Sequence, residues 1–270
     1  MLNKINETVS FIRHKISFEP EVAIILGTGL GGVVKDMKIK ETLEYSEIPN
    51  FPVSTAPGHH GKLIFGMLGG KKCMAMQGRF HFYEGYTMDE LTFPIRVMKY
   101  LGIKYLFISN ASGGLHPEYA IGDLMLIDDH INMMPNPLIG KHYEEFGDRF
   151  PDMSEAYDKK LLALAEAIAR DYCIKVQRGC YVGVTGPTLE TPKEYQYFRI
   201  IGGDTVGMST VPEVIVAHQM GIPCFAISII TDLGVPGKIV EVSVEDVQKA
   251  AGEAAPQMIL LMEKMIDKLN

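Results

Sequence analysis

The 270-residue sequence has few cysteines, few adjacent basic residues and no long apolar run, and each absence excludes a class of protein. Its four cysteines form no C-x-x-C pair, which argues against a disulfide framework and a structural zinc site. The formal net charge is −7, and no basic run exceeds a Lys-Lys pair, so nucleic-acid binding is not predicted. No apolar run reaches the roughly 20 residues that cross a bilayer. We expect a cytoplasmic protein with a small-molecule ligand.

The composition that remains is that of an ordinary α/β protein, with 47% hydrophobic and 22% charged residues. Apolar spacing and capping residues predict helices at 2–16, 87–102, 191–202, 210–221 and 243–269. Apolar runs predict strands at 22–26, 63–68, 105–109, 180–184 and 224–230, and one that begins at 73 and continues toward 83. No break in composition divides the chain. We therefore expect a single α/β domain over residues 1–270, with a central mixed β-sheet flanked by helices.

One long irregular stretch, residues 133–157, interrupts this pattern. Passive connections in compact domains are usually much shorter. We expect this stretch to reach a binding site or a neighbouring subunit.

The glycine-rich segment Gly27 to Gly32 follows the first strand and matches G-x-G-x-x-G. A dinucleotide site also needs a continuing helix and a second strand, whereas Pro49, Pro52 and Pro57 follow here. Backbone N–H groups and the Thr28 hydroxyl suit an anion equally well. A purely structural turn is the third alternative.

Arg79, His81 and Tyr83 alternate along the sequence and would share one face of an extended segment. Guanidinium and imidazole groups suit phosphate, and the phenol suits an adjacent sugar. A polar outer strand face explains the same alternation.

Histidines at 59, 60 and 81 raise the possibility of metal binding, but no further ligand stands at metal-ligand spacing, so we expect no metal site. His59 lies in a Pro-Gly-His loop and would suit an anion site. Other hydroxyl and small residues follow presumed strands, where ligand sites in α/β sheets gather. Among them, Ser209 would sit at a helix N-terminus, a favourable place for phosphate.

Taken in order, several motifs resemble those of the trimeric purine nucleoside phosphorylases. They are Ile25 to Gly32, Pro57 to His59, Gln77 to Tyr86, Asn110 to Gly114, Gly186 to Thr191, and Gly207 to Glu213. The resemblance covers nearly the whole chain. It implies a homotrimer of α/β subunits that cleaves purine nucleosides with inorganic phosphate, giving the free base and ribose 1-phosphate.

The resemblance also assigns roles to individual residues. Phosphate would be held by Thr28, Arg79, His81, the Ala111 backbone and Ser209, with His59 covering it. Tyr83 and Met208 would contact the ribose, and the base would lie among Ser112, Gly113, Leu189, Glu190, Val206, Thr231 and Asp232. His81, Glu190 and Asp232 would carry the chemistry, and Phe150 would enter the neighbouring subunit's site. Phosphate is a co-substrate, and no metal or organic cofactor is implied.

Two positions depart from the family pattern. Members acting on inosine and guanosine usually have asparagine where Asp232 stands, and an ionised aspartate can only accept hydrogen bonds. Val244 stands where a histidine contacts the 5′-hydroxyl. Asp232 could meet the N6 amino group of adenine, and Val244 suits a 5′-deoxy or methylthio group, so both departures resemble the methylthioadenosine phosphorylases. Glu190, by contrast, suits the N1–H of a 6-oxopurine, and we expect inosine and guanosine to be preferred.

Two functions of other classes stay open at this stage. A nucleoside-binding protein without catalysis would carry similar base contacts. A nicotinamide-dependent oxidoreductase would use the glycines at 27–32.

Overall fold

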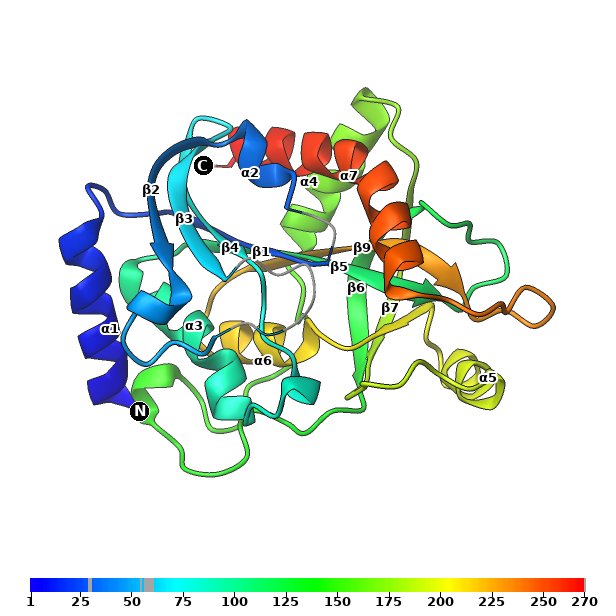
Figure 1. Cartoon of the computed structure of the whole chain (residues 1–270), viewed down its shortest axis with the longest axis horizontal. Helices are drawn as coiled ribbons and strands as arrows, with labels where there is room; N and C mark the ends of the chain where they lie inside the picture. Colours follow the sequence, from blue (N-terminus) through cyan, green and yellow to red (C-terminus); the bar gives the residue numbers. More distant parts are fainter. Residues whose placement is uncertain (29–30, 54, 56–60, 270) are drawn as a thin grey trace.

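A computed structural model describes residues 1–28, 31–53, 55 and 61–269 of the chain. A nine-stranded sheet with both parallel and antiparallel pairs runs through these residues in the order β2-β3-β4-β1-β5-β8-β7-β6-β9. Helices α2, α4 and α7 lie on one side of this sheet, and α1, α3 and α6 lie on the other (Figure 1). The expected α/β fold with a central mixed sheet is confirmed.

Strands and helices are interspersed along the chain, with β2 to β4 and β5 to β6 following one another without an α-helix between them. The strands are β1 (Val22–Leu26), β2 (Lys38–Glu44), β3 (Lys62–Leu68), β4 (Lys71–Gln77), β5 (Tyr105–Gly114), β6 (Leu124–Asn132), β7 (Val176–Gly183), β8 (Thr205–Gly207) and β9 (Cys224–Leu233). The α-helices are α1 (Leu2–Lys15), α2 (Val33–Asp36), α3 (Met88–Leu101), α4 (Lys159–Asp171), α5 (Pro192–Ile200), α6 (Val211–Gln219) and α7 (Val244–Asp267). In the described part of the chain, no helix is both long and apolar enough to cross a membrane.

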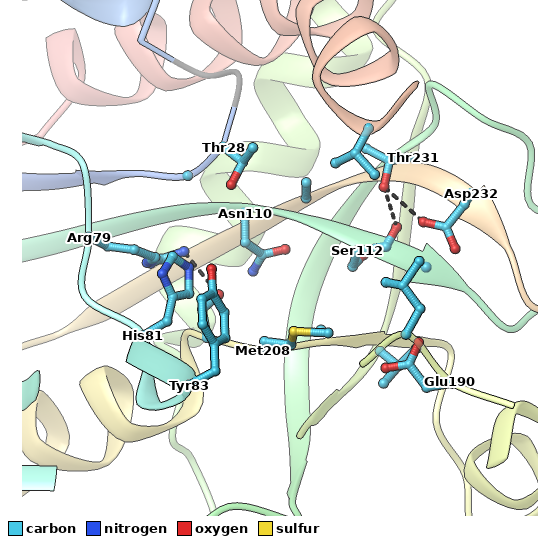
Figure 2. A pocket seen from close by; sticks show the side chains of 18 residues that line it. Thr28, Arg79, His81, Tyr83, Asn110, Ser112, Glu190, Met208, Thr231 and Asp232 are labelled. Atoms are coloured by element: carbon cyan, nitrogen blue, oxygen red, sulfur yellow. Dashed lines mark hydrogen bonds between the residues drawn. The ribbon is translucent and has the colours of Figure 1, made fainter. Parts of the chain in front are cut away.

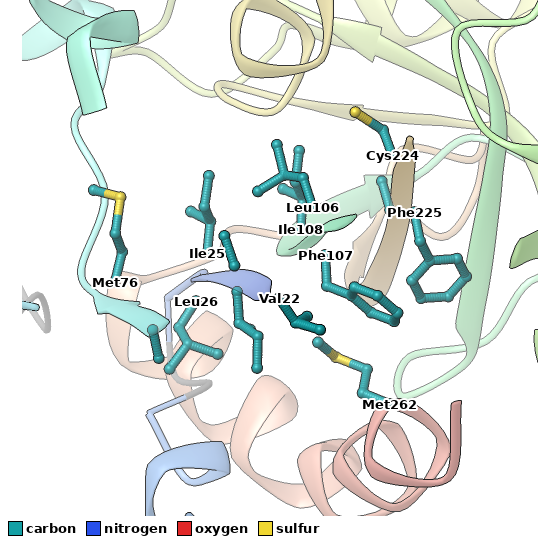
Figure 3. Close-up of a cluster of buried hydrophobic side chains, with 14 of the residues drawn as sticks. Val22, Ile25, Leu26, Met76, Leu106, Phe107, Ile108, Cys224, Phe225 and Met262 are labelled. Carbon is teal, nitrogen blue, oxygen red and sulfur yellow. The ribbon is translucent and has the colours of Figure 1, made fainter. Parts of the chain in front are cut away.

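The centre of the sheet is buried on both faces. Every residue of β1 is buried, as expected for a strand covered by helices on two sides. Phe107 of β5 and Phe225 of β9 pack with ring centroids 5.3 Å apart, and Met262 of α7 lies in the same cluster (Figure 3). This packing holds the central strands in fixed register.

β5 organises the sheet because it pairs with three other strands. Its first half pairs in parallel with β1, its whole length pairs in parallel with β9, and Gly113 and Gly114 pair antiparallel with β8. Strands β5, β8, β7, β6 and β9 therefore form a closed sheet, because β9 pairs back to β5. Since β1, β4, β5 and β9 are linked by parallel pairings, their carboxyl ends meet at one edge of the sheet.

The predicted helix starts are confirmed by their capping interactions. Thr87 and Thr191 each accept a hydrogen bond from the backbone N–H three residues on, at 3.3 Å. Ser243 begins α7 in the same way, with Asp246 as its partner. The long irregular stretch at 133–157 is also present, interrupted only by a 3₁₀ turn at Glu144–Phe146.

One predicted strand is wrong in its extent. β4 ends at Gln77 rather than continuing toward Tyr83, because Gly78 takes φ = 117° and turns the backbone out of the sheet. The segment Phe82–Glu84 is a 3₁₀ turn. The alternation of side chains along a strand therefore does not explain where Arg79, His81 and Tyr83 lie.

The structure also contains β2, β6 and α4, which the sequence analysis does not predict. β2 is an edge strand with a charged, mostly exposed sequence, so it lacks an apolar run. β6 begins apolar but carries Asp128 and Asp129 in its second half. α4 has a clear helical apolar pattern, from which it was predictable.

Candidate active site

A cavity of about 150 Å³ opens where the parallel strands end (Figure 2). It contains most of the residues that the sequence predicts for the site, namely Thr28, Arg79, His81, Tyr83, Ala111, Ser112, Gly113, Leu189, Glu190, Val206, Met208, Ser209, Thr231 and Asp232. Gly27, Asn110, Gly207 and Val247 complete the lining. The tertiary structure thus brings together residues from seven separate parts of the chain, five of which lie at the ordered motifs.

Three predicted residues are not placed in this cavity. His59 lies outside the described residues. Phe150 is 88% exposed and belongs to a different surface cavity of its own chain. Val244 is 52% exposed and does not line the site, whereas Val247, one turn further along α7, does. Along α7, Val247 has the same helical spacing as buried residues such as Ala251 and Met258, so spacing alone does not distinguish it from the core.

Arg79 occupies one end of the cavity and is almost fully buried. Its Nε and Nη2 donate to the two carboxylate oxygens of Glu213, at 3.2 and 3.1 Å. Its Nη1 donates to the Ser109 carbonyl at 2.9 Å and to the Ser209 hydroxyl at 3.0 Å. The two-point carboxylate contact fixes the plane of the guanidinium group.

Glu213 is a site residue that the sequence analysis treats only as a helix cap. The same carboxylate that binds Arg79 also accepts from the backbone N–H of Thr210 at 2.8 Å, which starts α6. Thr210 has φ = 70°, an uncommon conformation for a β-branched residue. Because Glu213 contacts both Thr210 and Arg79, it holds the start of α6 and the neighbouring Ser209 next to the guanidinium group.

A chain of buried polar side chains continues from this cap beneath the cavity. The side-chain amide nitrogen of Asn110 donates to the Thr210 hydroxyl at 2.8 Å, and the oxygen of the same amide accepts from the Ser228 hydroxyl. The Ser228 and Ser112 hydroxyls lie 2.6 Å apart. Because every member is hydrogen-bonded, this network holds the cavity floor rigid from one end to the other.

His81 and Tyr83 lie against each other beside Arg79. Their rings stack with centroids 4.8 Å apart and an interplanar angle of 14°. Burial lowers the pKa of His81, and the Glu84 carboxylate, 3.2 Å from its Nδ1, opposes that shift. A neutral ring whose Nδ1–H faces Glu84 leaves Nε2 as an acceptor, so His81 suits a protonated phosphate oxygen.

The opposite end of the cavity carries two carboxylates. Asp232 is 8% exposed, and its Oδ1 accepts from the Thr231 hydroxyl at 3.0 Å (Figure 2). Burial raises the pKa of both Glu190 and Asp232. A Cβ at position 113 would lie 2.9 Å from Asp232 Oδ2, so a larger residue there would displace this carboxylate.

The cavity walls between the two ends are apolar or aromatic. Tyr83 and Met208 lie between the Arg79 end and the Glu190 end (Figure 2). Burial raises the pKa of Tyr83 to about 12, so its phenol stays a neutral donor. Leu189, Val206 and Val247 supply the aliphatic surface.

The glycine-rich segment does not form a dinucleotide-binding unit. β1 leads into the four-residue helix α2, and the next strand, β2, pairs antiparallel with β3 at the edge of the sheet. The dinucleotide hypothesis is therefore wrong. Gly27 is needed because a Cβ there would lie 2.7 Å from the Ser109 carbonyl oxygen. Within the described residues, no three His, Cys, Asp or Glu side chains are grouped to hold a metal ion.

Comparison with known proteins identifies close relatives. Residues 21–267 match the model of the phosphorylase superfamily. The chain is 52% identical over 233 residues to purine nucleoside phosphorylase 1 of Bacillus subtilis, covering 86% of each chain. It matches Schistosoma mansoni purine nucleoside phosphorylase in complex with adenosine (TM-score 0.95, 42% identity, 100% of this chain and 98% of that one). The same Schistosoma enzyme in complex with inosine gives a TM-score of 0.94 at 40% identity, covering 100% and 97%.

The His81–Glu84 pair predicts a pH dependence of stability. Hydrogen bonds from His81 and Thr55 lower the pKa of Glu84 from 4.5 to about 2. A depressed folded-state pKa contributes stability that is present above about pH 4.5 and is lost as the pH falls toward 2. Between pH 5 and 3, we expect the free energy of unfolding to fall less steeply in Glu84→Gln than in the wild type. Chemical denaturation at several pH values measures this, with the exposed Glu253→Gln as control; equal slopes would contradict the assignment.

Proposed function

This chain belongs to the purine nucleoside phosphorylases of the phosphorylase superfamily, and on that premise we propose that it prefers 6-oxopurine nucleosides in phosphorolysis. The reaction gives a free purine base and ribose 1-phosphate. The observation that carries the proposal is the polarity of the cavity, in which a buried guanidinium stands at one end and two carboxylates, the buried Asp232 and the half-buried Glu190, stand at the other. Phosphate and purine need these opposite environments.

The Arg79 end suits the phosphate. The positive charge of Arg79, the Ser209 and Thr28 hydroxyls and the backbone at Ala111 line the same end of the cavity. Anions are held best by such preorganised donors in a site with little water. We propose His59 as a further phosphate contact on the resemblance alone.

The sugar lies between phosphate and base in this proposal, beside Tyr83 and Met208. Phosphate attacks the anomeric carbon while the purine leaves from the opposite face, through an oxocarbenium-like transition state. The negative charge of phosphate stabilises the cationic sugar, so catalysis consists of positioning and electrostatics. The chain's own residues supply these effects, and we propose no metal or organic cofactor.

The Glu190 end suits the purine. An ionised Glu190 accepts from the N1–H of hypoxanthine or guanine. Burial raises the pKa of Asp232 and so favours the protonated form, which donates to N7 or O6 of the leaving base. These two states together support the 6-oxopurine preference.

A second candidate substrate is adenosine or methylthioadenosine. An ionised Asp232 would accept from the N6 amino group of adenine. Val247 in the lining offers an apolar contact. The Schistosoma enzyme is described in complex with both adenosine and inosine.

We further propose that the protein is a homotrimer in the cytoplasm. Phe150 is 88% exposed on the irregular 133–157 stretch, an unfavourable position for a phenylalanine that no partner covers. Free cysteines at all four positions are compatible with a reducing compartment.

The substrate proposal is tested by phosphate-dependent base release from inosine, guanosine, adenosine and methylthioadenosine. We expect the highest kcat/KM with inosine and guanosine, because Glu190 accepts from N1–H. Cleavage of methylthioadenosine alone would overturn the base preference. Binding of nucleosides without any turnover would leave a non-catalytic binding protein.

Arg79→Ala should raise the KM for phosphate by roughly 10- to 100-fold, the effect of losing a hydrogen-bonding charge. The same change leaves Glu213 buried without its partner and should lower the thermal stability. Steady-state kinetics over a range of phosphate concentrations measure the first effect. Arg178→Ala, which removes a surface ion pair, is the control. An unchanged phosphate dependence would show that Arg79 does not hold phosphate.

Phe150→Ala should raise the KM for inosine at least several-fold while leaving the thermal stability of the subunit nearly unchanged, since the side chain is exposed. Analytical ultracentrifugation should give three times the 30.0 kDa mass of one chain. Ile200→Ala, also an exposed apolar residue, is the matched control. An active monomer would contradict both the trimer and the role of Phe150.

A further inference from the structure

Asn110 lies between the Arg79 end and the Asp232 end of the cavity and is 1% exposed (Figure 2). Its Nδ2 donates to the Thr210 hydroxyl at 2.8 Å, and its Oδ1 accepts from the Ser228 hydroxyl. A hydroxyl group both donates and accepts, whereas each end of an amide does only one of the two. Asn110 therefore decides the direction of the hydrogen bonds on both of its sides.

On the phosphate side, this direction passes from Thr210 to Ser209. Thr210 is fully buried, and its hydroxyl oxygen lies 3.1 Å from that of Ser209. If Ser209 donated in this pair, the hydrogen of the buried Thr210 hydroxyl would lose its acceptor, which costs free energy. Thr210 therefore donates to Ser209. The Ser209 oxygen also accepts from Arg79 Nη1 at 3.0 Å, so both bonds use its lone pairs and its own hydrogen is left for a group in the cavity.

On the base side, the direction leads to the opposite result. Ser228 is fully buried and donates to Asn110, so it accepts in its 2.6 Å contact with the Ser112 hydroxyl. A hydroxyl has a single hydrogen, and that of Ser112 is used in this contact. Ser112 lines the cavity and offers only lone pairs to it. The cavity thus has a hydroxyl donor at Ser209 and a hydroxyl acceptor at Ser112.

We propose that Asn110 is a positioning residue for phosphate binding, because its amide makes the Ser209 hydroxyl a hydrogen-bond donor toward the phosphate. This inference rests on the proposed function. The oxygens of phosphate carry negative charge and need donors. A donor whose direction is set before the anion binds requires no rearrangement when it binds. The amide acts through Thr210 on Ser209 and carries no charge of its own.

A rotation of the amide by half a turn would reverse every bond of this network. Thr210 would then donate to Asn110 and accept from Ser209, and a lone pair of Ser209 would face the phosphate. A lone pair repels an anionic oxygen, so phosphate binding requires the orientation that the structure contains. Because the two orientations leave the oxygens of the hydroxyl groups in place, the positions of the hydrogens distinguish them.

Neutron diffraction from deuterated crystals soaked in phosphate tests the direction itself. We expect deuterium on Asn110 Nδ2 toward Thr210, on Thr210 toward Ser209, and on Ser209 toward the phosphate. Deuterium on Ser209 that is directed at Thr210 would overturn the inference.

Asn110→Asp tests the consequence for binding, because it keeps the shape of the side chain and replaces its donor by an acceptor. Thr210 must then donate to the carboxylate, and Ser209 turns its hydrogen toward Thr210. We expect the KM for phosphate to rise roughly tenfold or more at alkaline pH. The ratio of variant to wild-type KM should fall as the pH is lowered, because a protonated carboxyl again donates to Thr210. Steady-state kinetics with phosphate as the varied substrate measure both effects.

A double-mutant cycle separates this effect from the added negative charge. In a Ser209→Ala background, Asn110→Asp should raise the KM for phosphate by a smaller factor than in the wild type, because the hydroxyl that it directs is absent. An equal factor in both backgrounds would show that the charge alone acts, and the role of Asn110 would fail.

Ser112→Ala is the matched control, since it removes a hydroxyl from the same network on the other side of Asn110. Ser228 still donates to Asn110 in this variant, so the donor at Ser209 is kept and the KM for phosphate should not change. A rise as large as that of Asn110→Asp would contradict the inference.

The outcomes separate the inference from the proposed function. If the wild type releases no base from any purine nucleoside with phosphate, the proposed function fails, and the deuterium positions still report the direction that Asn110 sets. If the wild type is active but Asn110→Asp leaves the KM for phosphate unchanged, only the role of Asn110 fails.

Discussion

The buried ion pair between Arg79 and Glu213 connects the end of β4 to the start of α6, and the organisation of the site depends on it. A charge buried without its partner is strongly destabilising, by about 3–5 kcal/mol, so neither side chain tolerates loss of the other. Glu213 also caps α6 through Thr210, and Thr210 begins the polar chain through Asn110 to Ser228 and Ser112. One ion pair thereby fixes the phosphate end and the floor of the cavity.

At the base end of the cavity, the charged side chains are two carboxylates, Glu190 and Asp232, and not an ion pair. Among the described residues that line the cavity, the basic side chains of Arg79 and His81 stand at the other end, and Asp232 accepts from the Thr231 hydroxyl at 3.0 Å. Burial therefore raises the pKa of both carboxylates there, whereas at the other end Glu213 forms a two-point hydrogen-bonded ion pair with Arg79. A phosphate dianion and a nucleoside whose purine carries hydrogen-bonding groups together match this division of charge.

Local patterns predict local features well. The capping residues Thr87, Thr191 and Ser243 begin helices as expected, because a cap involves only neighbours along the chain. The convergence of Arg79, His81 and Tyr83 was also predicted, although for a wrong reason, since a 3₁₀ turn and not a strand presents Tyr83. The role of Glu213 was missed, because it depends on Arg79, a partner from a distant segment.

The sequence by itself determined the α/β class, the family resemblance and the chemical types at each end of the site, because these follow from composition and from ordered motifs. Only the tertiary structure decided how strands β5 to β9 close and that Arg79 pairs with Glu213. These features arise from contacts between residues far apart in the chain. The raised pKa values of Glu190 and Asp232 in particular depend on burial, which spacing along a sequence does not encode.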